Sequence, residues 1–227
     1  PGSLRALPDP PSALFLNGDQ DLLGLAHLAI VGSRHPTTGG RQNAEAFARE
    51  LAASGLVISS GLATGIDTAA HLGALAADGM TVAVVGTGPD RIYPAANQEL
   101  AHRIAEHGLI VSEFPTGTPP SRGNFPRRNR VLAGLALGTL VVEAALQSGS
   151  LITARLAGEN GREVFALPGS IHNPLARGCH ALIRQGAKLV ETAADILEEL
   201  AAQIGQETPS AGSTEGASEN PPDPQHQ

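Results

Sequence analysis

The sequence is poor in several residue types on which whole classes of function depend. Its 227 residues include one cysteine, one lysine and one tyrosine, and no tryptophan. The lone Cys179 excludes an internal disulfide and any cysteine-based zinc site. Because no apolar run is long enough to cross a bilayer and no signal-peptide pattern is present, we expect a cytoplasmic protein without a membrane partner.

Motifs of the common cofactor-binding and hydrolytic sites are absent as well. The chain contains no G-x-x-x-x-G-K-[ST] phosphate loop, no H-E-x-x-H pair and no G-x-S-x-G nucleophile turn. A dinucleotide fingerprint requires G-x-G-x-x-G after the first strand, but Gly32 is followed by Ser33 and Arg34. A long side chain then occupies the place where the backbone should meet a pyrophosphate. The sequence therefore predicts no cofactor and no metal site.

The formal net charge of −7 is unevenly distributed along the chain. Residues 29 to 190 carry a balance of +3, whereas residues 191 to 227 hold eight acidic and no basic side chains. Residues 205 to 227 are rich in Ser, Pro, Gly and Glu, a composition that predicts a disordered acidic linker. Such a linker at one end, and Pro1 instead of Met at the other, lead us to expect a piece of a longer protein.

From Leu28 onward, apolar runs of four to six residues alternate with amphipathic segments of ten to fifteen. The predicted strands cover residues 28–31, 56–59, 81–85, 109–112, 139–142, 164–167 and 188–190. The predicted helices cover residues 40–53, 66–77, 98–107, 129–136, 151–159, 180–185 and 193–203. Unbroken apolar strands indicate burial on both faces, and strand–helix alternation indicates a parallel, doubly wound α/β sheet.

Domain boundaries follow from the same pattern. We expect one domain at residues 28–204, preceded at 1–27 by a Pro-rich, irregular extension that packs on the core, with a short extended arm near residues 13–16. The glycines at 55, 79, 108 and 161 follow helical runs, where left-handed helix caps are expected.

In a doubly wound sheet, ligands bind outside the carboxyl ends of the strands. The loops at those ends are rich in small residues, and the principal ones cover residues 32–36, 60–67, 86–90, 143–150 and 168–170. Glycine lets the backbone approach a ligand closely, and the helices that follow present free N–H groups and a positive dipole end. This edge of the sheet is predicted to favour anions.

Arginines are concentrated beside one of these loops, at positions 122, 127, 128 and 130. A solvated charge run is the simpler explanation of such a cluster. However, arginine is favoured where phosphates are bound in a forked geometry, and the chain is otherwise sparing with positive charge. Arg34 stands in a Gly-Ser-Arg turn at a strand end and is harder to explain structurally, so we predict that Arg34 and the arginines at 127, 128 and 130 bind phosphates.

Several other residues allow two interpretations. Asp67 and His71 lie four apart on one predicted helix, as an acid–base pair would, but stabilisation of the helix N-terminus and local packing are the favoured explanation. Glu143 at a strand end is a candidate catalyst or, equally, a partner of neighbouring loop N–H groups or of an arginine. Tyr93 and Phe125 either stack on bases or pack against apolar neighbours.

Taken together, the loop sequences resemble one known family. The segments IVGSR at 30–34, SGLATGIDTAAH at 60–71, FPRRNRVLAGL at 125–135 and VVEAALQSGSLITA at 141–154 resemble the DNA-processing protein A family, also called DprA or Smf. The resemblance implies an extended Rossmann-like, mostly parallel sheet with helices on both faces. It also implies a non-enzymatic, homodimeric protein that binds and protects single-stranded DNA and helps to load the RecA recombinase during natural transformation.

The resemblance and the residue pattern together predict the DNA-binding residues. These are Gly32, Ser33, Arg34, Ser60, Gly61, Thr64, Gly65, Arg127, Arg128, Asn129, Arg130, Ser148, Gly149 and Ser150. The arginines would contact successive phosphates and the loop N–H groups would donate to phosphate oxygens. About four neutralised phosphates per subunit predict a logarithmic salt slope of about −3.

Some features of the family pattern are missing or unplaced. Ala95 stands where some relatives have a basic residue, and we expect this sequence to be without the N-terminal helical and C-terminal winged-helix-like domains that many members carry. The dimer surface is not located, since Leu182, Leu189 and Ile196 would serve a core equally well. The alternative function is that of a Rossmann-like nucleotide hydrolase of the lysine-decarboxylase-like group, with Glu143 as catalyst, although the P-G-G-x-G-T-x-x-E loop of that group is absent.

Overall fold

The computed structural model describes residues 1–207, so most of the predicted acidic linker lies outside the described residues. An eight-stranded sheet has the order β1-β5-β4-β3-β2-β6-β7-β8. Seven strands run parallel, and the edge strand β1 pairs antiparallel with β5. The strands are β1 Phe15–Gly18, β2 His27–Val31, β3 Val57–Ser60, β4 Thr81–Val85, β5 Leu109–Ser112, β6 Gly138–Val141, β7 Glu163–Ala166 and β8 Lys188–Leu189.

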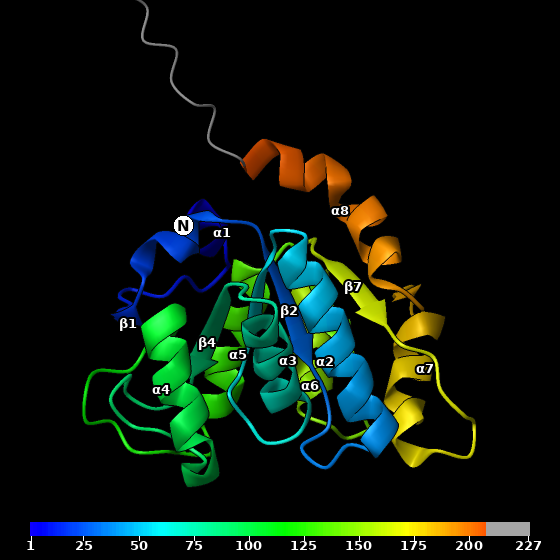
Figure 1. Cartoon of the computed structure of the whole chain (residues 1–227), viewed down its shortest axis with the longest axis horizontal. Coiled ribbons are helices and arrows are strands. Elements are labelled where there is room, and N and C mark those ends of the chain that lie inside the picture. Colours follow the sequence, from blue (N-terminus) through cyan, green and yellow to red (C-terminus); the bar gives the residue numbers. More distant parts are fainter. Residues whose placement is uncertain (208–227) are drawn as a thin grey trace, which may run out of the picture.

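Helices cover both faces of this sheet (Figure 1). One face carries α2 (Thr38–Ala53), α3 (Ile66–Ala76), α4 (Gln98–His107) and α8 (Ala193–Glu207). The other carries α5 (Asn124–Leu135), α6 (Ser150–Glu159) and α7 (Arg177–Arg184), with the short α1 (Gly2–Arg5) against α5. The predicted α/β, mostly parallel, Rossmann-like fold is therefore confirmed. Within residues 1–207, no helix combines the length and apolarity that crossing a membrane requires.

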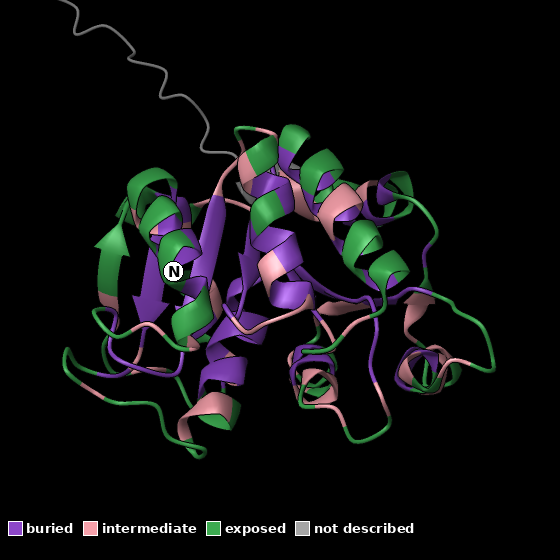
Figure 2. Ribbon diagram, turned by 60° about the horizontal axis from the view of Figure 1, so that its bottom comes forward, coloured by how far each residue is buried: buried purple, intermediate pink, exposed green. Residues whose placement is uncertain are grey.

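The core consists of two apolar layers separated by the sheet. Strands β2 to β6 are buried along their whole length, which explains their unbroken apolar runs (Figure 2). One layer packs Phe47 and Leu51 of α2 against the sheet, and the other packs Val131 and Leu132 of α5. Burial of a large aliphatic or aromatic side chain contributes about 2 kcal/mol, so these layers supply most of the stabilisation that fixes the sheet.

The N-terminal extension is more ordered than the sequence predicts. It forms α1, β1 and one 3-10 helix at Gln20–Gly24, and the extended arm begins at Phe15 rather than at residue 13. Leu4 and Leu7 are buried beside α5, where Leu7 lies so close to Gly134 that a side chain there would collide with it. The extension packs on the core through apolar contacts that its proline content conceals.

Two of the four predicted glycine caps are wrong. Gly55 and Gly161 adopt positive φ angles of 92° and 67°, as a left-handed cap requires. After α3, however, the residue with positive φ is Asp78, and a Cβ on Gly79 would lie only 2.6 Å from the Cβ of Ala52. Gly108 is extended, with φ −159°. These two glycines therefore provide space between elements rather than a special backbone angle.

Candidate nucleic-acid interface

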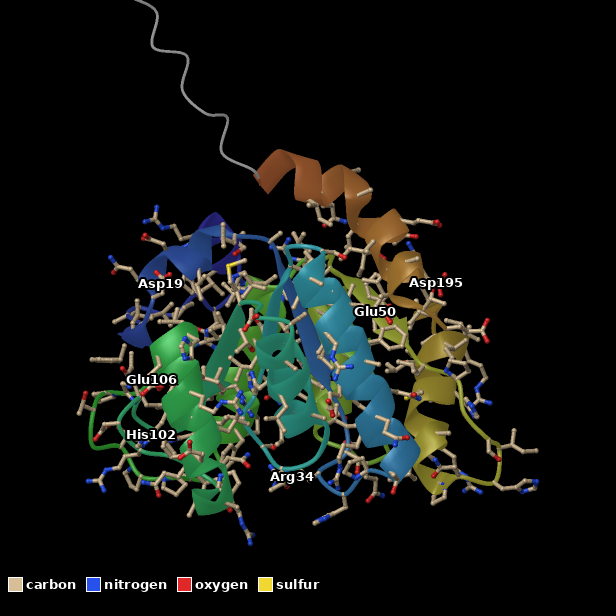
Figure 3. All side chains as sticks on the ribbon, viewed as in Figure 1. Asp19, Arg34, Glu50, His102, Glu106 and Asp195 are labelled. Carbon is tan, nitrogen blue, oxygen red and sulfur yellow. The ribbon has the colours of Figure 1, made fainter. Side chains whose placement is uncertain are left out.

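The loops after β2, β3, β4 and β6 converge on one end of the sheet. The chain runs outward from β2 to β5 and then returns to place β6 beside β2, so the strand order reverses between these two strands. Open α/β sheets bind ligands at such a switch point. Arg34 in the β2 loop projects from this end of the molecule, at the opposite end of α2 from Glu50 (Figure 3).

A pocket of about 640 Å³ opens at the switch point, and a smaller one of about 80 Å³ continues it toward the β3 loop. Nine of the predicted DNA-binding residues line these pockets: Gly32, Arg34, Gly61, Thr64, Arg128, Asn129, Ser148, Gly149 and Ser150. The predicted loops therefore form one continuous concave surface.

Glu143 holds the loops on the two sides of the switch point together. Its carboxylate accepts hydrogen bonds from the backbone N and Oγ1 of Thr37, at 2.8 and 2.7 Å, and from Nδ2 of Asn173 at 3.2 Å. Its carbonyl accepts from the backbone N of Ser33 at 2.6 Å. Gly40 lies against the carboxylate, with no space for a Cβ. Both carboxylate oxygens are engaged in shaping loops, which supports the structural interpretation of Glu143.

A cationic and aromatic wall forms one side of the pocket. The guanidinium carbon of Arg34 lies 5.8 Å from the ring centroid of Phe125, within the range of a cation–π interaction. That ring lies 5.7 Å from the ring of Tyr93, tilted by 40°, and Tyr93 is 47% exposed. Arg122 lines the same pocket. The predicted set omitted Arg122, Tyr93 and Phe125, although the position of Phe125 at the head of the arginine run was a usable signal.

The opposite side of the pocket is formed by the N-terminal end of helix α6. Helix α6 begins at Ser150, and its N-terminal end carries the partial positive charge of the helix dipole. The hydroxyls of Ser148 and Ser150 are 2.7 Å apart, which fixes the turn that enters the helix. Ser148, Gly149 and Ser150 all line the pocket, so this end of α6 can receive an anion.

Three predicted residues shape the site from behind the pocket surface. Ser60 is fully buried, and its hydroxyl donates to the carbonyl of Ile30 at 2.6 Å, so it has no free donor for a ligand. The carbonyl of Ser33 accepts from the backbone N of Ile66 at 3.1 Å. Gly65 has φ 84°, and a Cβ there would lie within 2.7 Å of the carbonyl carbon of Arg34. These contacts join the β2 and β3 loops.

The arginine cluster lies on a helix rather than in a loop. Helix α5 begins at Asn124, five residues earlier than predicted. Successive residues on an α-helix are about 100° apart, so Arg127, Arg128 and Arg130 point in different directions. This geometry separates side chains that are adjacent in the sequence.

Arg127 and Arg130 lie beside Glu113 and do not line the pocket. Arg130 forms a close ion pair with Glu113, and its Nε lies 3.3 Å from Oδ2 of Asp9 in the N-terminal extension. Nη2 of Arg127 lies 3.9 Å from Oε2 of Glu113, and its guanidinium is 5.4 Å from the ring centroid of Phe114. Glu113 thus compensates part of the charge that the sequence assigned to phosphate binding.

Arg128 is buried at the base of the pocket, with 6% of its surface exposed. Its Nη1 donates to the carbonyls of Gly61, at 2.7 Å, and Val84, while Nε donates to Oδ1 of Asn129 at 3.1 Å. Burial lowers the pKa of Arg128, and the nearby negative charge of Asp67 opposes that change. Burial likewise raises the pKa of Asp67, opposed by Arg128 and by loop N–H groups.

Asp67 and His71 do not form an acid–base pair with each other. Nδ1 of His71 lies 2.7 Å from Oγ1 of Thr81, whose hydroxyl donates to the carbonyl of Ile58, so the ring is the donor to Thr81. Burial lowers the pKa of His71 to about 3, which keeps the ring neutral. Asp67 instead accepts from the backbone N of Ala63 at 3.3 Å. Both side chains serve the interior of the fold. Among the described residues, no three His, Cys, Asp or Glu side chains are arranged to hold a metal ion.

Comparison with known proteins identifies the group to which this architecture belongs. Residues 1–201 match the family described as DNA recombination-mediator protein A. The chain belongs to this family. It is 51% identical over 201 residues to Protein Smf of Escherichia coli (strain K12), covering 88% of this chain and 54% of that protein. The chain therefore spans about half the length of this relative.

Solved structures of family members share the fold of this one. DNA processing protein A from Streptococcus pneumoniae is 48% identical, with a TM-score of 0.85 over 88% of this chain and 70% of that chain. The Helicobacter pylori protein, described for its unique single-stranded DNA binding mode, is 34% identical, with a TM-score of 0.82 over 89% of this chain and 93% of that chain. Molybdenum cofactor carrier proteins, at 17% identity and TM-scores of 0.52 to 0.53, share the fold alone.

Proposed function

We propose that this chain is the single-stranded DNA-binding core of a protein of natural transformation. In this role it protects incoming single strands in the cytoplasm and helps to load the RecA recombinase, without catalysing a reaction itself. The observation that carries the proposal is the switch-point pocket, where the Arg34 guanidinium and two aromatic rings face a serine- and glycine-rich helix N-terminus. Membership of a recombination-mediator family supports it.

The chemistry of the pocket favours an unpaired strand over a duplex. The negatively charged phosphates would bind to Arg34, to Arg122 and to the N-terminal end of α6. The rings of Tyr93 and Phe125 offer faces on which a base can stack, and only a base free of its complement can reach them. Stacking contributes about 1 to 3 kcal/mol per base and is tolerant of sequence, so binding should show little sequence preference.

Internal contacts of the arginines lower the expected salt dependence. Arg128 and Arg130 are engaged within the protein, which leaves Arg34, Arg122 and Arg127 exposed near the site. Three phosphate contacts on a single strand correspond to a logarithmic salt slope of about −2 per subunit, rather than the −3 expected from the sequence.

The proposal includes a homodimer and a RecA contact. Of the apolar residues considered for a dimer surface, Leu182 and Ile196 are buried in the chain's own core, whereas Leu189 on the edge strand β8 is 49% exposed. An edge strand with an exposed leucine is suited to pairing with another chain. Leu189 is therefore the candidate for the centre of the homodimer contact.

A fluorescence titration of labelled oligo-dT tests the proposal at several salt concentrations. The wild type should bind oligo-dT at least tenfold more tightly than a duplex of equal length, and Arg34→Ala should weaken binding about tenfold and flatten the salt slope by about 0.7. Arg49→Ala is the matched control. Arg49 pairs with Glu45 on α2, roughly 16 Å along the helix from Thr38, the end of α2 that lies near the pocket. Equal affinity for single strand and duplex, or an indifferent Arg34→Ala variant, would contradict the proposal.

A further inference from the structure

Arg128 differs from the other arginines of α5 because its hydrogen bonds reach two other parts of the sheet. From α5 it donates to the carbonyl of Gly61, directly after β3, and to the carbonyl of Val84 near the end of β4. These acceptors lie 67 and 44 residues away in the sequence. One buried guanidinium therefore ties α5 to the ends of two neighbouring strands, directly beneath the pocket.

The β3 loop is built around this guanidinium and Asp67. A Cβ on Gly61 would collide with the guanidinium of Arg128 and would lie 2.6 Å from Oδ2 of Asp67, so only glycine fits there. The same carboxylate accepts from the backbone N of Ala63. The loop is thus anchored from its inner side at two points.

The outer side of the loop is left available to a ligand. The backbone N–H groups of Thr64 and Gly65 have no hydrogen-bond partner among residues 1–207, and Thr64 lines the pocket beside Arg34. Two free donors on a loop that is held from beneath can bind an anion with little loss of conformational entropy.

We propose that Arg128 is a positioning residue for single-stranded DNA, acting through the residue 61–65 loop rather than by contacting a phosphate. The inference rests on the proposed function of the pocket. Because the charge of Arg128 is opposed by Asp67 and is shielded from solvent, it would neutralise no phosphate and so release few of the counterions condensed on the DNA. Its contribution is geometric: it sets the direction in which Thr64 and Gly65 present their N–H groups.

Oligo-dT titration at several salt concentrations distinguishes positioning from phosphate contact. Arg128→Lys keeps the positive charge opposite Asp67 but loses Nη1, which donates to both carbonyls, and Nε, which donates to Asn129. It should weaken binding about tenfold at every salt concentration with an unchanged salt slope, whereas Arg34→Gln should lower the slope by about 0.7. Gly61→Ala displaces the same guanidinium from the loop side and should reproduce the Arg128→Lys result.

A second readout does not depend on DNA. In free Arg128→Lys and Gly61→Ala, the amide of Ala63, which donates to Asp67, should exchange hydrogen at least fivefold faster than in the wild type, while amides of α2 keep their protection. Arg49→Gln is the control and should match the wild type in both measurements.

Three results would overturn the inference. A salt slope lowered as much as in Arg34→Gln would make Arg128 a phosphate contact. Wild-type affinity in both Arg128→Lys and Gly61→Ala would remove any role in binding, and unchanged exchange at the amide of Ala63 would remove the link through the loop. In each case the wild type still binds oligo-dT. A wild type that does not bind would instead refute the proposed function of the pocket, and the positioning role with it.

Discussion

Acidification should destabilise this fold through two buried histidines, of which His27 provides the sharper test. His27 is 1% exposed at the start of β2; its Nδ1 lies 2.7 Å from Oγ of Ser59 and its Nε2 lies 2.8 Å from the carbonyl of Leu22. Burial lowers the pKa of His27 to about 4, although the hydrogen bond to Leu22 opposes the change. The fold therefore holds this ring neutral where the unfolded chain would protonate it.

The sign and size of the effect follow from proton linkage. Between pH 6.5, the ordinary pKa of histidine, and pH 4, the unfolded chain binds a proton at residue 27 that the native chain does not, so the free energy of unfolding decreases as the pH falls through this window. At pH 5 the difference is about 2 kcal/mol. His71, with its pKa lowered to about 3, adds a loss of similar size. Asp67 has the opposite effect on stability. Burial raises its pKa, so the native chain binds a proton at this carboxyl more tightly than the unfolded chain does, and the free energy of unfolding increases as the pH falls.

Urea denaturation at pH 7 and pH 5 measures this loss, and His27→Gln isolates the contribution of one ring. The variant cannot titrate at this position, so its loss of stability between the two pH values should be about 2 kcal/mol smaller than that of the wild type. His102→Gln, on the exposed side of α4, is the matched control and should retain the wild-type difference. An equal loss in the wild type and His27→Gln would refute the reasoning.

Two further variants test the contacts around the site. Glu113→Gln removes the carboxylate that pairs with Arg130, so oligo-dT binding should tighten and the salt slope should steepen by about 0.7; an unchanged slope in the titration would contradict this. Glu143→Gln weakens the charged hydrogen bonds from Thr37, so urea denaturation should show a loss of about 1 to 3 kcal/mol. Hydrolysis of nucleoside monophosphates should be absent in both the wild type and Glu143→Gln, and turnover by the wild type that this variant abolishes would contradict the structural role.

The strands could be predicted from the sequence because burial on both faces leaves a local signal, an unbroken apolar run. The start of α5 could not, since Gly123 and Pro126 read as helix breakers. Proline is tolerated in the first turn of a helix, where its missing N–H would have no intrahelical partner, and Pro126 lies two residues after the first residue of α5. The segment that the sequence predicts as a loop before residue 129 is therefore the first turn of α5. Arg127, Arg128 and Arg130 consequently point in the directions that the helix imposes.

The burial of Arg128 could not be predicted from the sequence either, for a different reason. Its partners Gly61 and Val84 are distant in the sequence, and both offer only backbone carbonyls, which no side-chain pattern reveals. The one local trace is Gly61 itself, a glycine where α-left geometry is not needed and where the structure requires empty space. Recognising that requirement needs the fold first.

The same helix geometry changes what a cluster of arginines means for DNA binding. Arg127 faces Glu113, Arg128 points into the protein interior, and Arg130 faces Asp9 of the N-terminal extension. Much of their positive charge is therefore compensated within the protein. Few cations then remain to attract phosphates, and affinity must come largely from contacts that salt does not screen. Such contacts are offered by the rings of Phe125 and Tyr93 and by the free N–H groups of the residue 61–65 loop. An acidic chain can therefore bind a polyanion through a site that is pre-organised rather than strongly basic.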